Sequence, residues 1–136
     1  MADYFKWDDK YKLDIKEIDD QHQYFVSLLN DLYKTILDSA DRSVMAGVLD
    51  KLMAYAVDHF STEEKYFKAF NYEGREEHEE EHQKLLDKLT YLHQQFINNQ
   101  ADLSFELIDF LENWLVDHLD AMDKKYVDCF HEHGLR

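Results

Sequence analysis

The sequence predicts an all-α protein, an antiparallel up-down-up-down four-helix bundle with an N-terminal arm. The 136-residue chain has no proline and only three glycines, a composition that favours long helices over strands and hairpins. Its apolar residues recur every three or four positions in four segments joined by short connections, which make neighbouring helices antiparallel. We expect one domain over residues 1–136, with the arm at 1–18 and helices at about 19–37, 43–70, 76–98 and 104–130.

The arm lacks a helical period but is rich in apolar side chains, so we expect it to pack on the body of the protein. The first helix should begin at Asp19 or Asp20, either of which can cap it. His22 lies on its apolar face, where a single histidine is more typical of a core residue than of a metal ligand. The apolar residues of the arm are Tyr4, Phe5, Trp7, Tyr11, Ile15 and Ile18.

The second helix carries a glutamate inside its apolar stripe. Glu63 follows His59 by four residues, so the two side chains lie on one helix face. A glutamate in such a stripe is costly unless it is paired or coordinated, whereas Glu64 and Lys65 are expected to face solvent. The predicted inner face consists of Val44, Val48, Leu52, Tyr55, Ala56, His59, Glu63, Tyr66, Phe67 and Phe70.

A second pair, His78 and His82, has the same spacing at the start of the third helix. Asn71 and Gly74 are turn residues that would fold this pair back against the first. The histidines continue into the apolar face of the third helix, so they should point inward. We expect His93, at the edge of that face, to be a structural or surface residue.

The fourth helix contributes His118 and Asp123, which are five residues apart. On a regular helix they would point about 140° apart, so we expect a π-type bulge or a loosened turn between them. Ser104 can cap this helix. At its far end, the single Cys129 excludes an internal disulfide and is expected to be a small buried or half-exposed hydrophobe. In the tail, His131 and His133 are expected to be exposed.

In an antiparallel bundle these donors all fall at one end. Imidazole suits iron, copper, nickel and zinc, while carboxylate suits harder ions. Seven ligands are too many for one tetrahedral zinc ion, so two six-coordinate ions fit better. Five histidines, two bridging carboxylates and one oxo or hydroxo bridge would leave one position open for a small exogenous ligand. The candidate metal ligands are His22, His59, Glu63, His78, His82, His118 and Asp123.

The pattern formed by His22, His59-x-x-x-Glu63, His78-x-x-x-His82 and His118-x-x-x-x-Asp123 resembles that of hemerythrins at every liganding position. The stretch Ile18-Asp19-Asp20-Gln21-His22 and the arm with Trp7 are similar to the bacterial branch of the family. The resemblance implies an oxo- or hydroxo-bridged centre of two iron ions that binds O2 reversibly, and also small anions such as azide.

The same resemblance implies how the seven residues divide between the two ions. One iron would be held by His78, His82 and His118. The other would be held by His22 and His59 and would keep the open position, with Glu63 and Asp123 bridging both ions. Apolar side chains beside these ligands are expected to line the O2 pocket, and they are Phe25, Phe60, Trp114 and Leu115.

Several functions are compatible with such a site. The favoured one is an oxygen carrier, store or delivery protein for an oxygen-using enzyme, with no catalytic residue. The alternatives are an O2-sensing module of a signalling protein, or a di-iron oxidase, peroxidase or NO-handling enzyme. Ferritin-like carboxylate enzymes use a Glu-x-x-His motif from each of two helices, and here only Glu79-x-x-His82 has that spacing.

The formal net charge of −15 disfavours nucleic acids and anionic membranes as partners. No apolar run approaches the roughly 20 residues of a membrane span, so membrane insertion is not expected. The N-terminus, MADYFKWDDKYK, is charged and lacks the apolar core of a signal peptide. We therefore expect a cytoplasmic protein.

Overall fold

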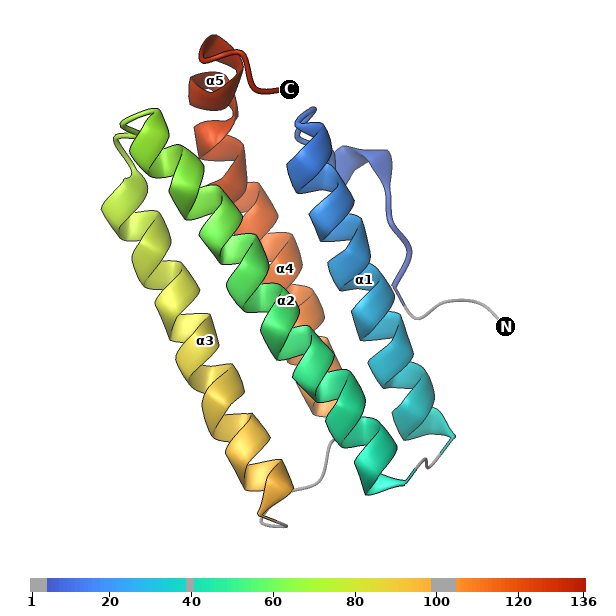
Figure 1. Cartoon of the computed structure of the whole chain (residues 1–136). Helices are drawn as coiled ribbons and strands as arrows, with labels where there is room; N and C mark the ends of the chain where they lie inside the picture. The colour runs from blue at the N-terminus through green and yellow to red at the C-terminus, as the bar shows by residue number, and fades with distance from the viewer. Residues whose placement is uncertain (1–4, 39–40, 99–104) are drawn as a thin grey trace.

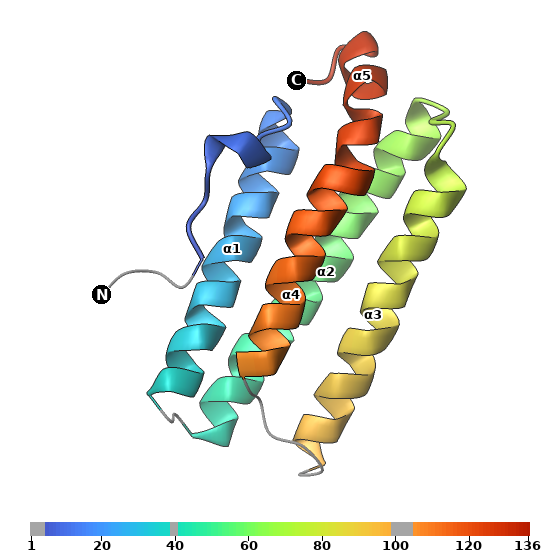
Figure 2. The ribbon, with the colours of Figure 1, turned by 180° about the vertical axis from the view of Figure 1, so that it is seen from behind.

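The computed structural model describes residues 5–38, 41–98 and 105–136, and these form the predicted antiparallel four-helix bundle (Figures 1 and 2). Helices α1 and α2 are joined at one end, α2 and α3 at the other, and α3 and α4 at the first end again. The described residues contain no strand. The elements are α1 (Lys16–Leu37), α2 (Arg42–Ala69), α3 (Arg75–Ile97), α4 (Phe105–His118), η2 (Leu119–Asp123) and α5 (Lys124–Glu132).

The arm packs along α1, as the sequence predicted (Figure 2). Phe5, Leu13 and Ile15 are buried in the core, while Tyr4 lies outside the described residues. The backbone N–H of Phe5 donates to Asn30 Oδ1 over 2.8 Å, and Asn30 Nδ2 donates back to the Phe5 carbonyl over 2.9 Å. One short 3-10 helix, η1 (Asp9–Tyr11), breaks the arm. Apolar burial and this amide clamp together hold the arm in place.

Helix α1 begins three residues earlier than expected, and the predicted caps are wrong. Its N-cap is Ile15, which makes no side-chain capping bond. Asp19 is buried inside the first turn, where its Oδ1 accepts a hydrogen bond from the backbone N–H of Leu13 over 2.8 Å. Asp20 is exposed and pairs with Lys16. The carboxylate of Asp19 therefore orders the arm instead of capping the helix.

The turn between α2 and α3 uses both predicted turn residues. Asn71 has a φ of 52°, in the left-handed region that asparagine tolerates better than most residues. Gly74 is the N-cap of α3, and a Cβ there would lie 2.8 Å from the hydroxyl oxygen of Tyr72. Glycine therefore lets the Tyr72 ring lie against this turn, and a larger residue would require that ring to shift. The turn brings the start of α3 back beside the end of α2.

The predicted inner face of α2 is correct over most of its length and wrong at its start. Val44, in the first turn, is 50% exposed. From Leu49 onward the buried positions are those of one helical stripe that contacts the core, in which Leu49 replaces the predicted Val48 as a fully buried residue. Ser104, the predicted cap of the fourth helix, lies outside the described residues.

The irregularity predicted between His118 and Asp123 is present. Helix α4 ends at His118, and residues Leu119–Asp123 form the π-helical segment η2 before the α-helix resumes as α5. The wider turn places both His118 and Asp123 on the buried side of the bundle. The fourth helix thereby takes in one extra residue and continues directly into α5, whose place at the end of α4 is seen in Figure 1.

A continuous apolar core fills the bundle and holds the four helices in register. Leu29, Leu52, Leu89 and Leu111 are completely buried, one from each of the four long helices. The core supplies a rigid frame for the polar side chains at the end of the bundle where α2 turns into α3. In the described part of the chain, no helix has the length and apolar character needed to cross a membrane.

Candidate metal centre

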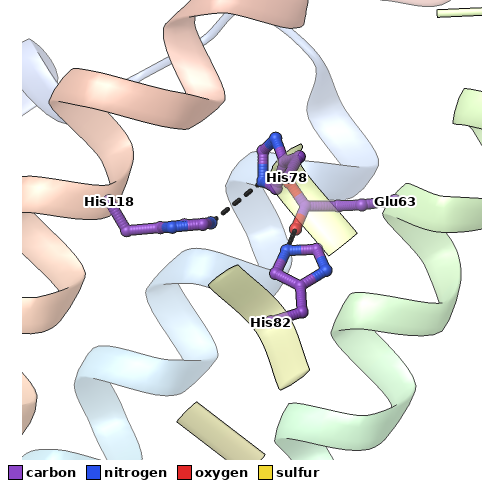
Figure 3. A group of neighbouring side chains, drawn as sticks. All are labelled: Glu63, His78, His82 and His118. Atoms are coloured by element: carbon purple, nitrogen blue, oxygen red, sulfur yellow. Dashed lines mark hydrogen bonds and ion pairs between the residues drawn. The ribbon is translucent and has the colours of Figure 1, made fainter. Parts of the chain in front are cut away.

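All seven predicted ligands are buried and lie together at one end of the bundle. Each long helix contributes at the level where antiparallel packing brings it to that end: α1 near its start, α2 near its end, α3 near its start, and α4 with η2 near the close of the chain (Figure 1). Figure 3 shows four of these side chains pointing toward one another from three different helices.

The donor atoms form two groups, in each of which one atom per residue lies within 4.8 Å of the others. One group contains Glu63 with three histidines, and the other contains Glu63 and Asp123 with two histidines. Glu63 thus belongs to both groups, as a bridging carboxylate would. The groups are Glu63, His78, His82 and His118, and His22, His59, Glu63 and Asp123.

Asp123 also spans the two groups. Its Oδ1 lies 2.9 Å from His78 Nε2 and 3.0 Å from His118 Nε2, while its Oδ2 lies 3.1 Å from His22 Nε2. Glu63 Oε1 lies 3.1 Å from His82 Nε2 and 3.3 Å from His59 Nε2. Every one of the five histidines therefore directs its Nε2 toward a carboxylate oxygen.

The two carboxylates carry buried oxygens that accept no hydrogen bond from the described residues, namely Glu63 Oε1 and both oxygens of Asp123. In the same part of the chain, their ion-pair partners are all histidines, with no lysine or arginine. An unpaired buried carboxylate is costly. The arrangement therefore fits cations held between the carboxylate oxygens and the histidine nitrogens.

The electrostatics of the site keep both carboxylates ionised. Burial and the nearby Asp123 raise the pKa of Glu63, but His59 and His82 outweigh them and lower it to about 2. Burial likewise opposes ionisation of Asp123, yet His118, His22 and His78 hold its pKa well below the ordinary value. Two adjacent buried negative charges attract cations strongly.

The histidine environment favours metal binding on the side of His59. Burial lowers the pKa of His59 to about 3, against the opposing effect of Glu63. Its imidazole is therefore neutral at pH 7, and the neutral ring is the form that binds metal ions. Burial also lowers the pKa of His118, but Asp123 reverses the effect and raises it.

Three residues of the site were missed from the sequence. Tyr126 is fully buried and its hydroxyl donates to Glu63 Oε2 over 2.5 Å. Gln21 contacts His59, and Glu64 contacts His82. The prediction that Glu64 faces solvent is wrong, since its side chain is only 33% exposed and reaches across to α3. Tyr126 follows Asp123 by three residues, a helical spacing that could have indicated it.

An apolar cavity lies beside His22, His59 and His118. Its volume is about 10 Å³, the space that roughly one water-sized molecule requires. All four residues predicted for an O2 pocket line it, namely Phe25, Phe60, Trp114 and Leu115, and their role there stays a prediction. Tyr55 and Ala56 complete the lining and were not predicted.

The remaining histidines lie outside the seven-residue cluster. His93 is half-buried and its Nε2 lies 2.5 Å from Asp50 Oδ1, which agrees with a structural role. His133 is exposed as predicted and stacks on Phe70. His131 is partly buried, contrary to prediction, because α5 continues to Glu132 and brings its Nε2 within 3.0 Å of the Asp14 carbonyl oxygen. Cys129 is half-exposed, as predicted.

Comparison with known proteins identifies a family. Residues 13–130 match the model of the hemerythrin HHE cation-binding domain. A bacteriohemerythrin of Methylococcus capsulatus is 32% identical over 82% of this chain and 84% of its own length. A myohemerythrin of Riftia pachyptila is 30% identical over 90% of both chains.

Solved structures agree with the sequence comparison. A crystal structure of wild-type hemerythrin superposes with a TM-score of 0.88 at 29% identity, covering 93% of this chain and 97% of its own. A leucine-to-alanine mutant of hemerythrin gives a TM-score of 0.89 at 28% identity, covering 94% and 98%. The likeness therefore includes the whole bundle and not only the histidine pattern.

Proposed function

Since the chain belongs to the hemerythrin family, we propose that it binds O2 reversibly at a centre of two iron ions and serves as an oxygen carrier or store. The proposal rests on the observation that a set of metal ligands and an apolar cavity lie side by side. Seven buried donors form two metal-binding groups that share a carboxylate, and an apolar cavity of molecular size lies beside both histidines of one group and His118 of the other.

The donor set fits iron. His78, His82 and His118 would hold one ion, His22 and His59 would hold the other, and Glu63 with Asp123 would bridge them. Iron bound there supplies a ferrous–ferric couple whose electrons O2 can accept and return. Imidazole and carboxylate donors suit this metal, and the residues offer more ligands than one tetrahedral ion requires.

The side chains around the cavity favour binding over turnover. Phe25, Phe60 and Leu115 are buried and apolar, so they keep water and anions from the ion beside them. Exclusion of water withholds the solvation that a departing reduced oxygen species needs. The polar side chains of the lining are three candidate metal ligands, His22, His59 and His118, and Tyr55, whose hydroxyl already donates to the Gln21 carbonyl.

Among the described residues, the Glu-x-x-His ligand motif of carboxylate-rich di-iron enzymes does not contribute its glutamate to this site. Glu79 has the spacing to His82 that such enzymes use, but its Oε2 instead accepts a hydrogen bond from Arg75 Nε over 3.3 Å. Glu79 belongs to neither donor group. The site therefore has five histidines against two carboxylates, a balance that suits ferrous iron better than strongly oxidised iron.

Two measurements on the purified protein test the proposal. Protein expressed in iron-replete medium is expected to hold two iron ions per chain, and reduced protein is expected to take up O2 without sustained consumption when a reductant is present. One tightly held zinc ion with no iron would contradict the di-iron centre. Many turnovers of O2 or peroxide per site would favour an enzyme instead.

A further inference from the structure

Two side chains that are not candidate metal ligands contact site histidines at Nδ1, the ring nitrogen that faces away from the two carboxylates Glu63 and Asp123. His59 Nδ1 lies 2.6 Å from Gln21 Oε1, and His82 Nδ1 lies 3.0 Å from Glu64 Oε2. The outer Nδ1 atoms of His22 and His78 have no hydrogen-bond partner among the described residues. His59 and His82 belong to different donor groups. The partner of His59 is the neutral amide of Gln21, whereas the partner of His82 is the carboxylate of Glu64.

The orientation of the Gln21 amide follows from its neighbours. The hydroxyl of Thr62 donates to the carbonyl oxygen of Asp58 over 3.0 Å, so its oxygen is left to accept. Gln21 Nε2 donates to that oxygen over 3.3 Å. The amide oxygen of Gln21 must then face His59, where it can only accept. His59 Nδ1 therefore carries the proton, and its Nε2 has a free lone pair.

A second contact fixes Gln21 along the chain. The hydroxyl of Tyr55 donates to the backbone carbonyl of Gln21, and the Tyr55 ring lies parallel to the His59 ring, with centroids 5.6 Å apart and planes 5° apart. Gln21 and Tyr55 thus contact the His59 ring directly, and Thr62 acts on it only through Gln21. The orientation of this ligand is set before a metal ion arrives.

Glu64 favours the same tautomer of His82, with the proton on Nδ1, and differs from Gln21 in being a carboxylate. An ionised carboxylate can only accept, so His82 Nδ1 donates the proton and Nε2 is left facing Glu63. The Phe60 ring stacks on the other side of His82, with centroids 3.9 Å apart and planes 8° apart. A carboxylate on the outer nitrogen raises the donor strength of a metal-bound imidazole more than a neutral amide does.

We propose that Gln21 and Glu64 are positioning residues that fix the tautomers of His59 and His82 and make the two metal positions electronically unequal. The group with three histidines receives the stronger donor, so an ion there is stabilised in its oxidised state. The group with two histidines, both of which line the apolar cavity, receives the weaker donor. The assignment of the tautomers holds for any metal, whereas the inequality of the two metal positions rests on the proposed iron centre.

The tautomers are tested on metal-free protein, because a metal ion bound at Nε2 would itself force the ring proton onto Nδ1. Nitrogen–proton correlation spectra of the histidine rings are expected to show a proton on Nδ1 of both His59 and His82. A proton on Nε2 of either ring would overturn the proposal. Zinc affinity, measured against a competing chelator, is expected to fall about 10–100-fold in Glu64→Gln, the range typical for loss of such a contact.

The inequality is tested through the reduction potential of the iron-loaded protein. Glu64→Gln is expected to raise the potential and Gln21→Glu to lower it. Glu80→Gln is the matched control: Glu80 lies two residues before His82, is exposed and lies outside both donor groups. Its variant should shift the potential much less. Shifts of the same sign in the first two variants, or an equal shift in the control, would contradict the proposal.

A pair of uncharged variants separates hydrogen bonding from simple charge. Thr62→Ser keeps the hydroxyl that orients Gln21, and Thr62→Val removes it at nearly constant volume. Zinc affinity is expected to be retained in the serine variant and weakened in the valine variant. Equal affinity in both would show that the Thr62 hydroxyl does not orient the ligand. Protein that shows the Nδ1 tautomers but holds no iron would refute the proposed function and leave the tautomer assignment intact.

Discussion

At the scale of single residues, the central fact is that Glu63 and Asp123 are ionised and completely buried. The surrounding histidines hold the pKa of both carboxyls below their ordinary values despite burial. Such charges are tolerated only when their oxygens are satisfied. Tyr126 satisfies one oxygen of Glu63, and we propose that metal ions satisfy the others.

Tyr126→Phe tests this requirement. The substitution removes the hydroxyl that donates to Glu63 Oε2 over 2.5 Å and leaves a buried charged oxygen without its donor. We expect a loss of about 1–3 kcal/mol in the free energy of unfolding, measured by chemical denaturation of the metal-loaded protein. Tyr66→Phe is the control, because its hydroxyl donates to Glu17 at the surface. Equal losses in the two variants would contradict the account.

Leu115 and Leu89 separate the role of the cavity from that of the core. Both leucines are buried, but only Leu115 lines the apolar cavity. Leu115→Ala is expected to speed autoxidation and azide binding several-fold, because water and anions then reach the site more easily. Leu89→Ala is expected to lower the free energy of unfolding by about 2–5 kcal/mol with little effect on those rates. Equal autoxidation of wild type and Leu115→Ala at matched iron content would make Leu115 an ordinary core residue.

The residues that the sequence could identify are those whose role follows from spacing within one helix. His59 with Glu63 and His78 with His82 are one turn apart, so a helical reading directs each pair to one face. Gln21 and Glu64 could not be found this way. Their partners lie 38 and 18 residues away in the chain, and only the packing of two helices decides which polar side chain meets which histidine.

At the scale of elements, the π-helical segment η2 matters most for the site. It is the part of the fourth helix that carries Asp123 inward beside His118. The sequence predicted it, because two inward-facing residues five positions apart are incompatible with a regular helix. The start of α1 could not be predicted equally well, since the tertiary contact of Asp19 with the arm overrides its tendency to cap.

Metal removal is expected to loosen η2 and α5 selectively. These elements are held at the site end by Asp123 and Tyr126, whereas Leu29, Leu52 and Leu111 pack in the apolar core along the bundle. Without cations the buried carboxylates repel each other, and binding free energy is lost from the native state. Amide hydrogen exchange should rise in η2 and α5 of the metal-free protein and stay nearly unchanged around Leu52. A uniform rise along all helices would contradict this local coupling.

At the scale of the whole molecule, one end of the bundle holds the polar site and the remainder is an apolar frame. The net charge of −15 surrounds the site with a negative field, which favours cations and repels anions that would compete with neutral O2. The antiparallel order of the helices and the common level of the ligands were predictable, because short connections make consecutive helices antiparallel. The cavity was predictable only in part, since Tyr55 and Ala56 enter its lining through packing against other helices.

The most direct test of reversible O2 binding is the optical spectrum of the reduced, iron-loaded protein through a cycle of air and vacuum. Exposure to air is expected to produce a new visible absorption, since bound iron would supply electrons that O2 can accept. Removal of O2 is expected to restore the starting spectrum, with unchanged iron content and over repeated cycles. A spectrum that does not change in air, or that changes once and never returns, would contradict the account.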